Sequence, residues 1–164
     1  MSADLSSFRG TRIYLDTMMP YAFLRGVEAE IRLLFDRIER GEITAHTSVL
    51  TLDELAYRLL LALVRDRYDD SPLDRLRSDE ARLVSEFYPV LLPRLADLAA
   101  FPNLSVESIG LADWAVASQV MERYGLRPRD ALHVATMERL GCLDLASNDD
   151  HFDRVPGIRR FYTQ

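Results

Sequence analysis

The sequence contains no lysine, because all 20 of its basic residues are arginine. This absence excludes a P-loop, which needs its lysine to reach the phosphates of a nucleotide, and it excludes Schiff-base chemistry through lysine. Arginine is well suited to phosphate, since its planar guanidinium matches the phosphate oxygens. We therefore expect any phosphate contact in this chain to be made by arginine.

Other absences narrow the class of protein. The single cysteine, Cys142, permits no internal disulfide and no cysteine-based zinc cage. No apolar run approaches the ~18 residues of a membrane helix, and the first residues, MSADLSSFRGTR, lack the apolar region of a secretory signal. No G-x-S-x-G elbow is present, so serine hydrolysis has no support. We expect a cytoplasmic protein that makes no contact with a membrane.

The composition is typical of a globular protein. The 164 residues are 48% hydrophobic and 28% charged, which predicts a single domain over 1–164 with a substantial core. The net charge of −6 argues mildly against a nucleic-acid binder, which usually carries a basic surface. A site made of several carboxylates would contribute negative charge of this kind, and divalent cations would offset it.

Strand-like and helix-like segments alternate along the chain. The predicted strands are 12–16, 42–48, 103–109, 142–147 and 158–163. The predicted helices are 27–41, 49–68, 79–100, 111–125 and 128–141. The segment 69–78 is predicted to be a loop, and Pro89 and Pro93 to kink or split the helix that contains them. The alternation predicts an α/β fold with a mostly parallel sheet, and the helices between 49 and 100 predict a projecting helical hairpin.

Four acidic residues occupy compatible ends of these elements. Asp16 ends the first predicted strand, and Asp149, beside Asp150, follows the fourth. Glu54 lies just inside the helix after the second strand, and Asp130 lies in the first turn of the helix that Pro128 opens. Because strand carboxyl ends and helix N-termini face the same edge of a parallel sheet, these acids can reach one cleft.

Each acid also has a purely structural explanation. Asp130 would interact well with its helix dipole, and Glu54 could be a solvated helix residue. Asp149 and Asp150 could form a turn or cap a short helix over 150–154. Taken together, however, the four carboxylates suit Mg²⁺ or Mn²⁺ and the hydrolysis of a phosphate ester, since hard cations prefer carboxylate oxygen.

The segment from 125 to 158, GLRPRDALHVATMERLGCLDLASNDDHFDRVPGI, resembles the PIN-domain family of metal-dependent ribonucleases, which includes the VapC-type toxins of toxin–antitoxin pairs. The shared pattern is an Asp-Ala that opens a helix, here Asp130-Ala131, followed by a strand and Thr/Ser-x-Asp-x-x-Phe, here residues 147–152. The segments IYLDT and TSVLTLDELAYRL resemble the family's first strand with its acid and the segment with its second acid.

The resemblance implies an α/β/α sandwich, a homodimer and RNA as substrate. It implies that one or two Mg²⁺ or Mn²⁺ ions are held by four residues, Asp16, Glu54, Asp130 and Asp149. Ser147 would hold Asp149 or a water, and Thr17 would support the site beside the first acid. Family members usually read Thr/Ser-Asn after that acid, whereas this chain has Met18 in place of the amide.

Several basic residues remain open to interpretation. Arg127 and Arg129 flank the third acid, where they could contact phosphates, be solvated or pair with Asp130. His133 follows Asp130 by one turn and is more typical of a packing histidine than of a ligand. Neither His46 nor His151 has a zinc-ligand spacing with it.

We predict a divalent-metal-dependent endoribonuclease, the toxin of a type II toxin–antitoxin pair. The resemblance implies that an antitoxin protein inhibits it by wrapping the helical hairpin and placing an arginine in the acidic cleft. One alternative is a catalytically weak PIN-like module that binds RNA or protein. Another is a metal-dependent phosphatase or DNA nuclease that uses the same acids.

Overall fold

A parallel sheet forms the centre of the computed structural model, which describes residues 2–68 and 71–163. In these residues six strands lie in the order β1-β6-β5-β2-β3-β4, and every neighbouring pair is parallel. The strands are β1 (Ser2–Asp4), β2 (Arg12–Leu15), β3 (Thr44–Ser48), β4 (Leu104–Glu107), β5 (Asp144–Ala146) and β6 (Arg159–Tyr162). The predicted α/β fold with a parallel sheet is confirmed.

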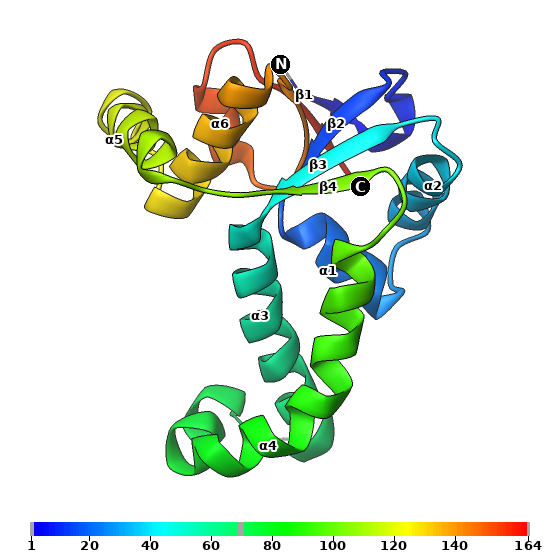
Figure 1. The fold of residues 1–164 in the computed structure, drawn as a ribbon, viewed down its shortest axis with the longest axis vertical. Helices are drawn as coiled ribbons and strands as arrows, with labels where there is room; N and C mark the ends of the chain where they lie inside the picture. The colour runs from blue at the N-terminus through cyan, green and yellow to red at the C-terminus, as the bar shows by residue number, and fades with distance from the viewer. Residues whose placement is uncertain (1, 69–70, 164) are drawn as a thin grey trace.

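Helices cover both faces of this sheet. They are α1 (Met18–Arg25), α2 (Ala29–Glu39), α3 (Val49–Tyr68), α4 (Pro72–Ala99), α5 (Leu111–Tyr124) and α6 (Pro128–Leu140). Two short 3₁₀ turns are η1 (Leu5–Ser7) and η2 (Asp150–Arg154). Figure 1 shows α5 and α6 on one side of the sheet and α1 to α4 on the other. The three-layer α/β/α arrangement is therefore confirmed.

The alternation of side chains along β2 explains why there are two helical layers. Ile13 and Leu15 point to one face, where they join an apolar cluster with residues of α1 to α4. Tyr14 points to the opposite face and joins a second cluster with residues of α5 and α6. All three side chains are fully buried, as expected for the central strand of a sheet covered on both faces.

The predicted helical hairpin is formed by α3 and α4, and it projects from the sheet in Figure 1. Leu55 and Leu59 of α3 and Leu83 and Leu91 of α4 are buried in the same apolar cluster. The apolar positions of α3 therefore pack largely within the chain.

The start and the bend of α4 differ from the prediction. Residues 72–78 were predicted to be a loop but are helical, because Pro72 occupies the first helical position and Leu76 is buried in the core. Of the rest of that predicted loop, Ser71 is not helical, as expected, and 69–70 lie outside the described residues. The helix is not split at Pro89 or Pro93, one of the two outcomes predicted for them, because the backbone angles there are helical; its interruption lies instead at Asp79 (φ −149°, ψ 40°).

Three elements were not predicted: β1, η1 and α1. The strand β1 pairs with β6 through Ser2–Arg160 and Ala3–Phe161, although its three residues have little strand propensity. The helix α1 begins two residues after Asp16 and turns the chain away from the end of β2. No helix in the described ranges, 2–68 and 71–163, combines the length and the apolarity needed to cross a membrane.

Candidate active site

Two adjacent strands deliver the first and last acids to the same edge of the sheet. β2 and β5 are neighbours, with Leu15 in register with Ala146. Asp16 directly follows β2, and its backbone N–H donates to the carbonyl of Ala146 at 3.1 Å. Ser147 directly follows β5, and Asp149 comes two residues later. The chain reversal after β5 thus places Asp149 near Asp16.

Two helix starts bring the other acids to this edge. β3 runs directly into α3, which carries Glu54 in its second turn. α5 ends at Gly125, whose left-handed backbone (φ 64°) only glycine adopts easily, and α6 begins at Pro128 with Asp130 in its first turn. All four predicted acids line one pocket of about 510 Å³; the other lining residues are Thr17, Met18, Arg58, Arg127, Pro128 and Arg129.

Ser147 connects the two strand ends. Its side chain is fully buried, and its hydroxyl donates to Asp16 Oδ2 at 2.7 Å. The same hydroxyl accepts a hydrogen bond from the backbone N–H of Asp149 at 3.0 Å. The other oxygen of Asp16, Oδ1, accepts from the backbone N–H of Thr17 at 2.5 Å. Ser147 therefore orients Asp16 directly and Asp149 through its backbone.

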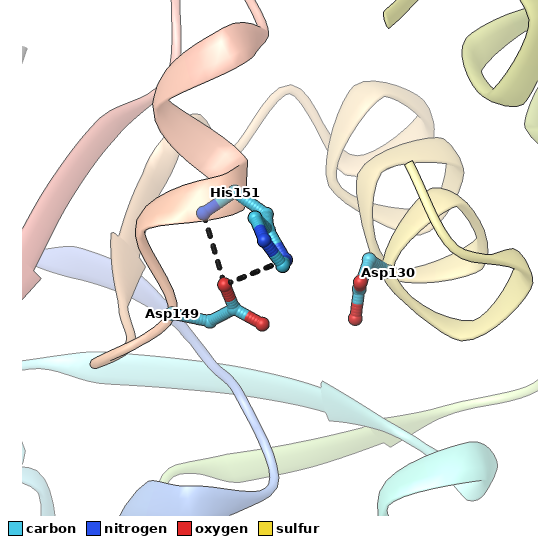
Figure 2. Close-up of side chains that lie close together, drawn as sticks. All are labelled: Asp130, Asp149 and His151. Carbon is cyan, nitrogen blue, oxygen red and sulfur yellow. Dashed lines mark hydrogen bonds and ion pairs between the residues drawn. The ribbon is translucent and has the colours of Figure 1, made fainter. Parts of the chain in front are cut away.

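Asp130 and Asp149 face each other across the pocket. One ligand atom from each, together with one from His151, lies within 4.8 Å of the others, and Figure 2 shows Asp130 on α6 opposite Asp149 and His151. Asp149 precedes η2, where its Oδ1 accepts from the backbone N–H of His151 at 2.9 Å and lies 3.2 Å from His151 Nδ1. Asp149 is thus a helix cap, as one alternative predicted, and also part of a carboxylate pair.

Asp130 has an unsatisfied charge. Its Oδ2 is buried and has no hydrogen-bond partner among the described residues. Burial raises the pKa of this carboxyl, and the nearby charges of Asp149 and Asp16 raise it further. A divalent cation between Asp130 and Asp149 would supply the missing partner and offset the like charges. Oxygen ligands of this kind fit Mg²⁺ or Mn²⁺, and an imidazole such as that of His151 is also acceptable to Mn²⁺.

Glu54 is held by protein groups instead. Its carboxylate accepts hydrogen bonds from the Thr17 hydroxyl and from Arg129 Nη1, the latter at 2.9 Å. Burial alone would raise the pKa of Glu54, but the His133 imidazole, whose Nε2 lies 3.9 Å from Glu54 Oε2, and the hydrogen bonds from Thr17 and Arg129 outweigh it and lower that pKa to about 2. Among the described residues, neither Glu54 nor Asp16 belongs to the compact group of Asp130, Asp149 and His151.

The flanking arginines lie at the mouth of the pocket. Arg129 pairs with Glu54 and, at 3.7 Å, with Asp53, whereas the alternative weighed for it was a pair with Asp130. Arg127 is exposed and lines the pocket without a hydrogen bond or ion pair to the described part of the chain. Both arginines lie where a phosphate group could approach the pocket.

Two histidines near the acids were not assigned a role from the sequence. His133 is buried, as expected of a packing residue, but its Nε2 lies 3.9 Å from Glu54 Oε2 and its Nδ1 lies 3.0 Å from the Tyr14 hydroxyl. His151 follows Asp149 by two residues. The i, i+3 spacing of Asp130 and His133 could have indicated the first, whereas only the tertiary structure places His151 against Asp130.

The sequence and the fold were compared with known proteins. The model of the PIN domain family matches residues 13–158. One similar solved structure is VapBC2 from Rickettsia felis bound to a DNA fragment from its promoter, with a TM-score of 0.61 and 13% identity over 93% of this chain and 99% of that chain. A second is FitAcB from Neisseria gonorrhoeae, with a TM-score of 0.56 and 18% identity over 91% of this chain and 96% of that chain. A third is the sarcin–ricin-loop-cleaving toxin VapC20 from Mycobacterium tuberculosis, with a TM-score of 0.53 and 17% identity over 86% of this chain and 92% of that chain. No curated protein matches the chain.

The structural likenesses lie below 25% identity and therefore support the fold, while the family model covers most of the sequence. The matched range includes Asp16, Glu54, Asp130 and Asp149, in the order that the resemblance required. This chain belongs to the PIN-domain family.

Proposed function

We propose that this chain is a divalent-metal-dependent endoribonuclease that hydrolyses RNA phosphodiesters in the cytoplasm. The observation that carries the proposal is the buried Oδ2 of Asp130 beside Asp149, for which residues 2–68 and 71–163 supply no hydrogen-bond partner. A bound Mg²⁺ or Mn²⁺ would draw charge from a phosphate oxygen and lower the pKa of an attacking water. The sarcin–ricin-loop-cleaving toxin, whose fold is similar, supports RNA as the substrate class.

The protein groups have distinct roles in this proposal. Asp130 and Asp149 hold the cation, with Asp16 and Glu54 as the further ligands that the family resemblance implies. Ser147 fixes the carboxylate of Asp16. Thr17 and Arg129 fix the carboxylate of Glu54 by hydrogen bonds. Arg127 lines the same pocket and is available to a phosphate oxygen of the substrate.

We propose further that the chain is the toxin of a type II toxin–antitoxin pair and forms a homodimer. The similarity of its fold to VapBC2 supports an antitoxin partner. That partner would wrap the α3–α4 hairpin and place an arginine among the acids. Equal RNA cleavage with and without the protein encoded by the neighbouring gene would contradict this part of the proposal.

One observation favours the alternative of a catalytically weak RNA- or protein-binding module. Glu54 already accepts hydrogen bonds from Thr17 and Arg129, and Met18 lines the pocket where family members usually carry an amide. If Glu54 does not exchange these partners for a cation, the site has fewer free ligands and hydrolysis is slow.

Cleavage of a mixed RNA pool by the purified chain tests the proposal. We expect cleavage with Mn²⁺ or Mg²⁺, and loss of at least ~100-fold in rate with EDTA and in the Asp16→Asn and Asp130→Asn variants, since each change removes charge that the cation needs. Asp150→Asn is the matched control, because Asp150 is an exposed neighbour outside the pocket. No cleavage by folded, metal-loaded wild type would favour the binding module.

Labelled DNA and a small phosphate ester, tested in parallel with the RNA pool, separate the remaining candidates. A ribonuclease should cleave the RNA but neither the DNA nor the small phosphate ester. Turnover of the small ester, or of DNA at a similar rate, would instead support the phosphatase or DNA nuclease that uses the same acids.

A further inference from the structure

A second pocket continues from the candidate active site along α3. It has a volume of about 250 Å³ and is lined by Tyr21, Arg58, Leu61, Ala62, Arg65, Pro72 and Leu73. Arg58 lines both this pocket and the one that contains the acids. The two hollows therefore meet at the Arg58 side chain.

The spacing of residues on α3 explains this continuity. Glu54, Arg58, Leu61 and Arg65 follow one another at intervals of four, three and four residues, so they lie on one face of the helix. The rise from Glu54 to Arg65 is about 16 Å at 1.5 Å per residue. α1 contributes Tyr21 to one wall, and the first turn of α4 contributes Pro72 and Leu73 to another.

The arginines on this face are available to an anion. Arg58 is exposed and makes no hydrogen bond or ion pair within the described part of the chain. Arg65 Nε lies 3.9 Å from Asp66 Oδ1, while Arg25 already binds Asp66 Oδ2 at 2.7 Å. In a protein with a net charge of −6, two such guanidiniums beside an acidic site require a specific explanation.

We infer that this second pocket, which we call the Arg58 pocket, binds single-stranded RNA adjacent to the bond that is cleaved. Arg58 and Arg65 contact successive backbone phosphates, and the Tyr21 ring with the half-exposed Leu73 side chain (44%) receives a base. The hollow, with a volume of about 250 Å³ and apolar side chains in its lining, is of a size to receive an unstacked base. The inference rests on the proposed ribonuclease function and extends its substrate site.

Binding of a fluorescent single-stranded RNA, measured by anisotropy in EDTA over a range of salt concentrations, tests the inference without cleavage. Each lost phosphate contact should reduce the slope of log K against log salt by about 0.7. We therefore expect this reduction for Arg58→Gln and for Arg65→Gln, and no reduction for Arg94→Gln. Arg94 is a matched control, because it is an exposed helical arginine that lines neither pocket.

The Tyr21 substitutions test the base contact. Tyr21→Leu should weaken binding roughly tenfold, since stacking on an aromatic ring is lost, whereas Tyr21→Phe should bind as wild type does. Circular dichroism establishes that each variant is folded.

The outcomes separate this inference from the proposed function. Cleavage by wild type with unchanged salt slopes in both arginine variants would overturn the Arg58 pocket alone. Loss of antitoxin inhibition in these variants, with RNA binding intact, would assign the pocket to a protein and also overturn it. Arginine-dependent RNA binding without cleavage in Mn²⁺ would support the pocket and contradict the ribonuclease.

Discussion

At the scale of single residues, the candidate site contrasts satisfied and unsatisfied carboxylates. Asp16 accepts hydrogen bonds from Ser147 and Thr17. Glu54 accepts hydrogen bonds from Thr17 and Arg129. Asp130 has a buried oxygen without any such donor in the described residues. This difference indicates where a cation would contribute most to stability.

Removal of the Asp130 charge should stabilise the metal-free protein. The raised folded-state pKa means that ionised Asp130 costs stability at neutral pH, and that the cost fades as the pH falls through that pKa. We expect Asp130→Asn in EDTA at pH 7 to raise the Tm by about 2–4 °C, the shift that ~1 kcal/mol produces in a domain of this size. Calorimetry of both proteins measures it.

The control for this prediction is Asp150→Asn. This substitution removes the same charge from an exposed position, and it should change the free energy of unfolding by less than ~0.5 kcal/mol. A lower Tm for Asp130→Asn than for wild type would mean that the ionised carboxylate is stabilised by the protein alone.

At the scale of elements, α5 and α6 are joined by an ion pair between the first turn of α5 and the last turn of α6. Asp113 accepts from the backbone N–H of Gly110 and from Arg139 Nε, both at 2.8 Å. Arg139 Nη2 also donates to the carbonyl of Ser108 at 2.8 Å. These contacts therefore fix how α5 packs against α6, at the end of α6 opposite to Asp130.

This ion pair predicts a pH dependence of stability. The hydrogen bond from Gly110, followed by the Arg139 charge, lowers the pKa of Asp113 in the folded state. The stability it contributes is therefore complete above the ordinary value of 3.8 and is lost as the pH falls through the folded-state pKa. Asp113→Asn should cost about 1.5 kcal/mol at pH 7.

Urea unfolding of wild type and Asp113→Asn at several pH values measures this difference. The gap between the two proteins should narrow below pH 3.8. The same substitution at Asp97, which is exposed on α4, should leave stability unchanged at every pH. A gap that stays constant into acid would show that the Asp113 charge plays no part.

The hairpin offers a test of helix packing within α4. Leu83 is fully buried, whereas Leu92 on the same helix is 51% exposed. We expect Leu83→Ala to cost about 2–5 kcal/mol through lost burial and a residual cavity, and Leu92→Ala to change stability by less than ~0.5 kcal/mol. Equal effects in urea unfolding would contradict the packing of α4 against α3.

At the scale of the whole molecule, the candidate site links elements that are distant in the sequence. Its acids come from the end of β2, from α3, from α6 and from the turn after β5, and they line one pocket. A cation bound there would connect the two helical layers across the sheet. We propose that the chain unfolds as the single domain expected from its length.

Metal binding should therefore stabilise the whole fold. At a Mn²⁺ concentration 100-fold above its Kd, linkage predicts about 2.7 kcal/mol, or a Tm increase of roughly 5–10 °C. EDTA should reverse the increase, and Asp130→Asn should abolish most of it. Scanning fluorimetry against Mn²⁺ concentration measures the effect, and an equal increase in Asp130→Asn would place the ion elsewhere.

The order of residues alone determined the layered fold and the set of candidate acids. Alternating strand and helix periodicity indicated a parallel α/β sheet, and the positions of Asp16, Glu54, Asp130 and Asp149 at element ends indicated a common edge. Predictions from local sequence patterns were wrong where contacts between residues far apart in the sequence determine the structure. β1 forms because β6 offers it a partner, and residues 72–78 become helical because Leu76 is buried in the core.

Only the tertiary structure decided how the acids differ from one another. No donor in the described residues reaches the buried Oδ2 of Asp130, whereas Thr17 before α1 and Arg129 and His133 on α6 converge on Glu54. The position of His151 against Asp130 depends on the turn after β5 meeting the start of α6. Spacing in a sequence cannot supply these distances, because they depend on how the helical layers pack on the sheet.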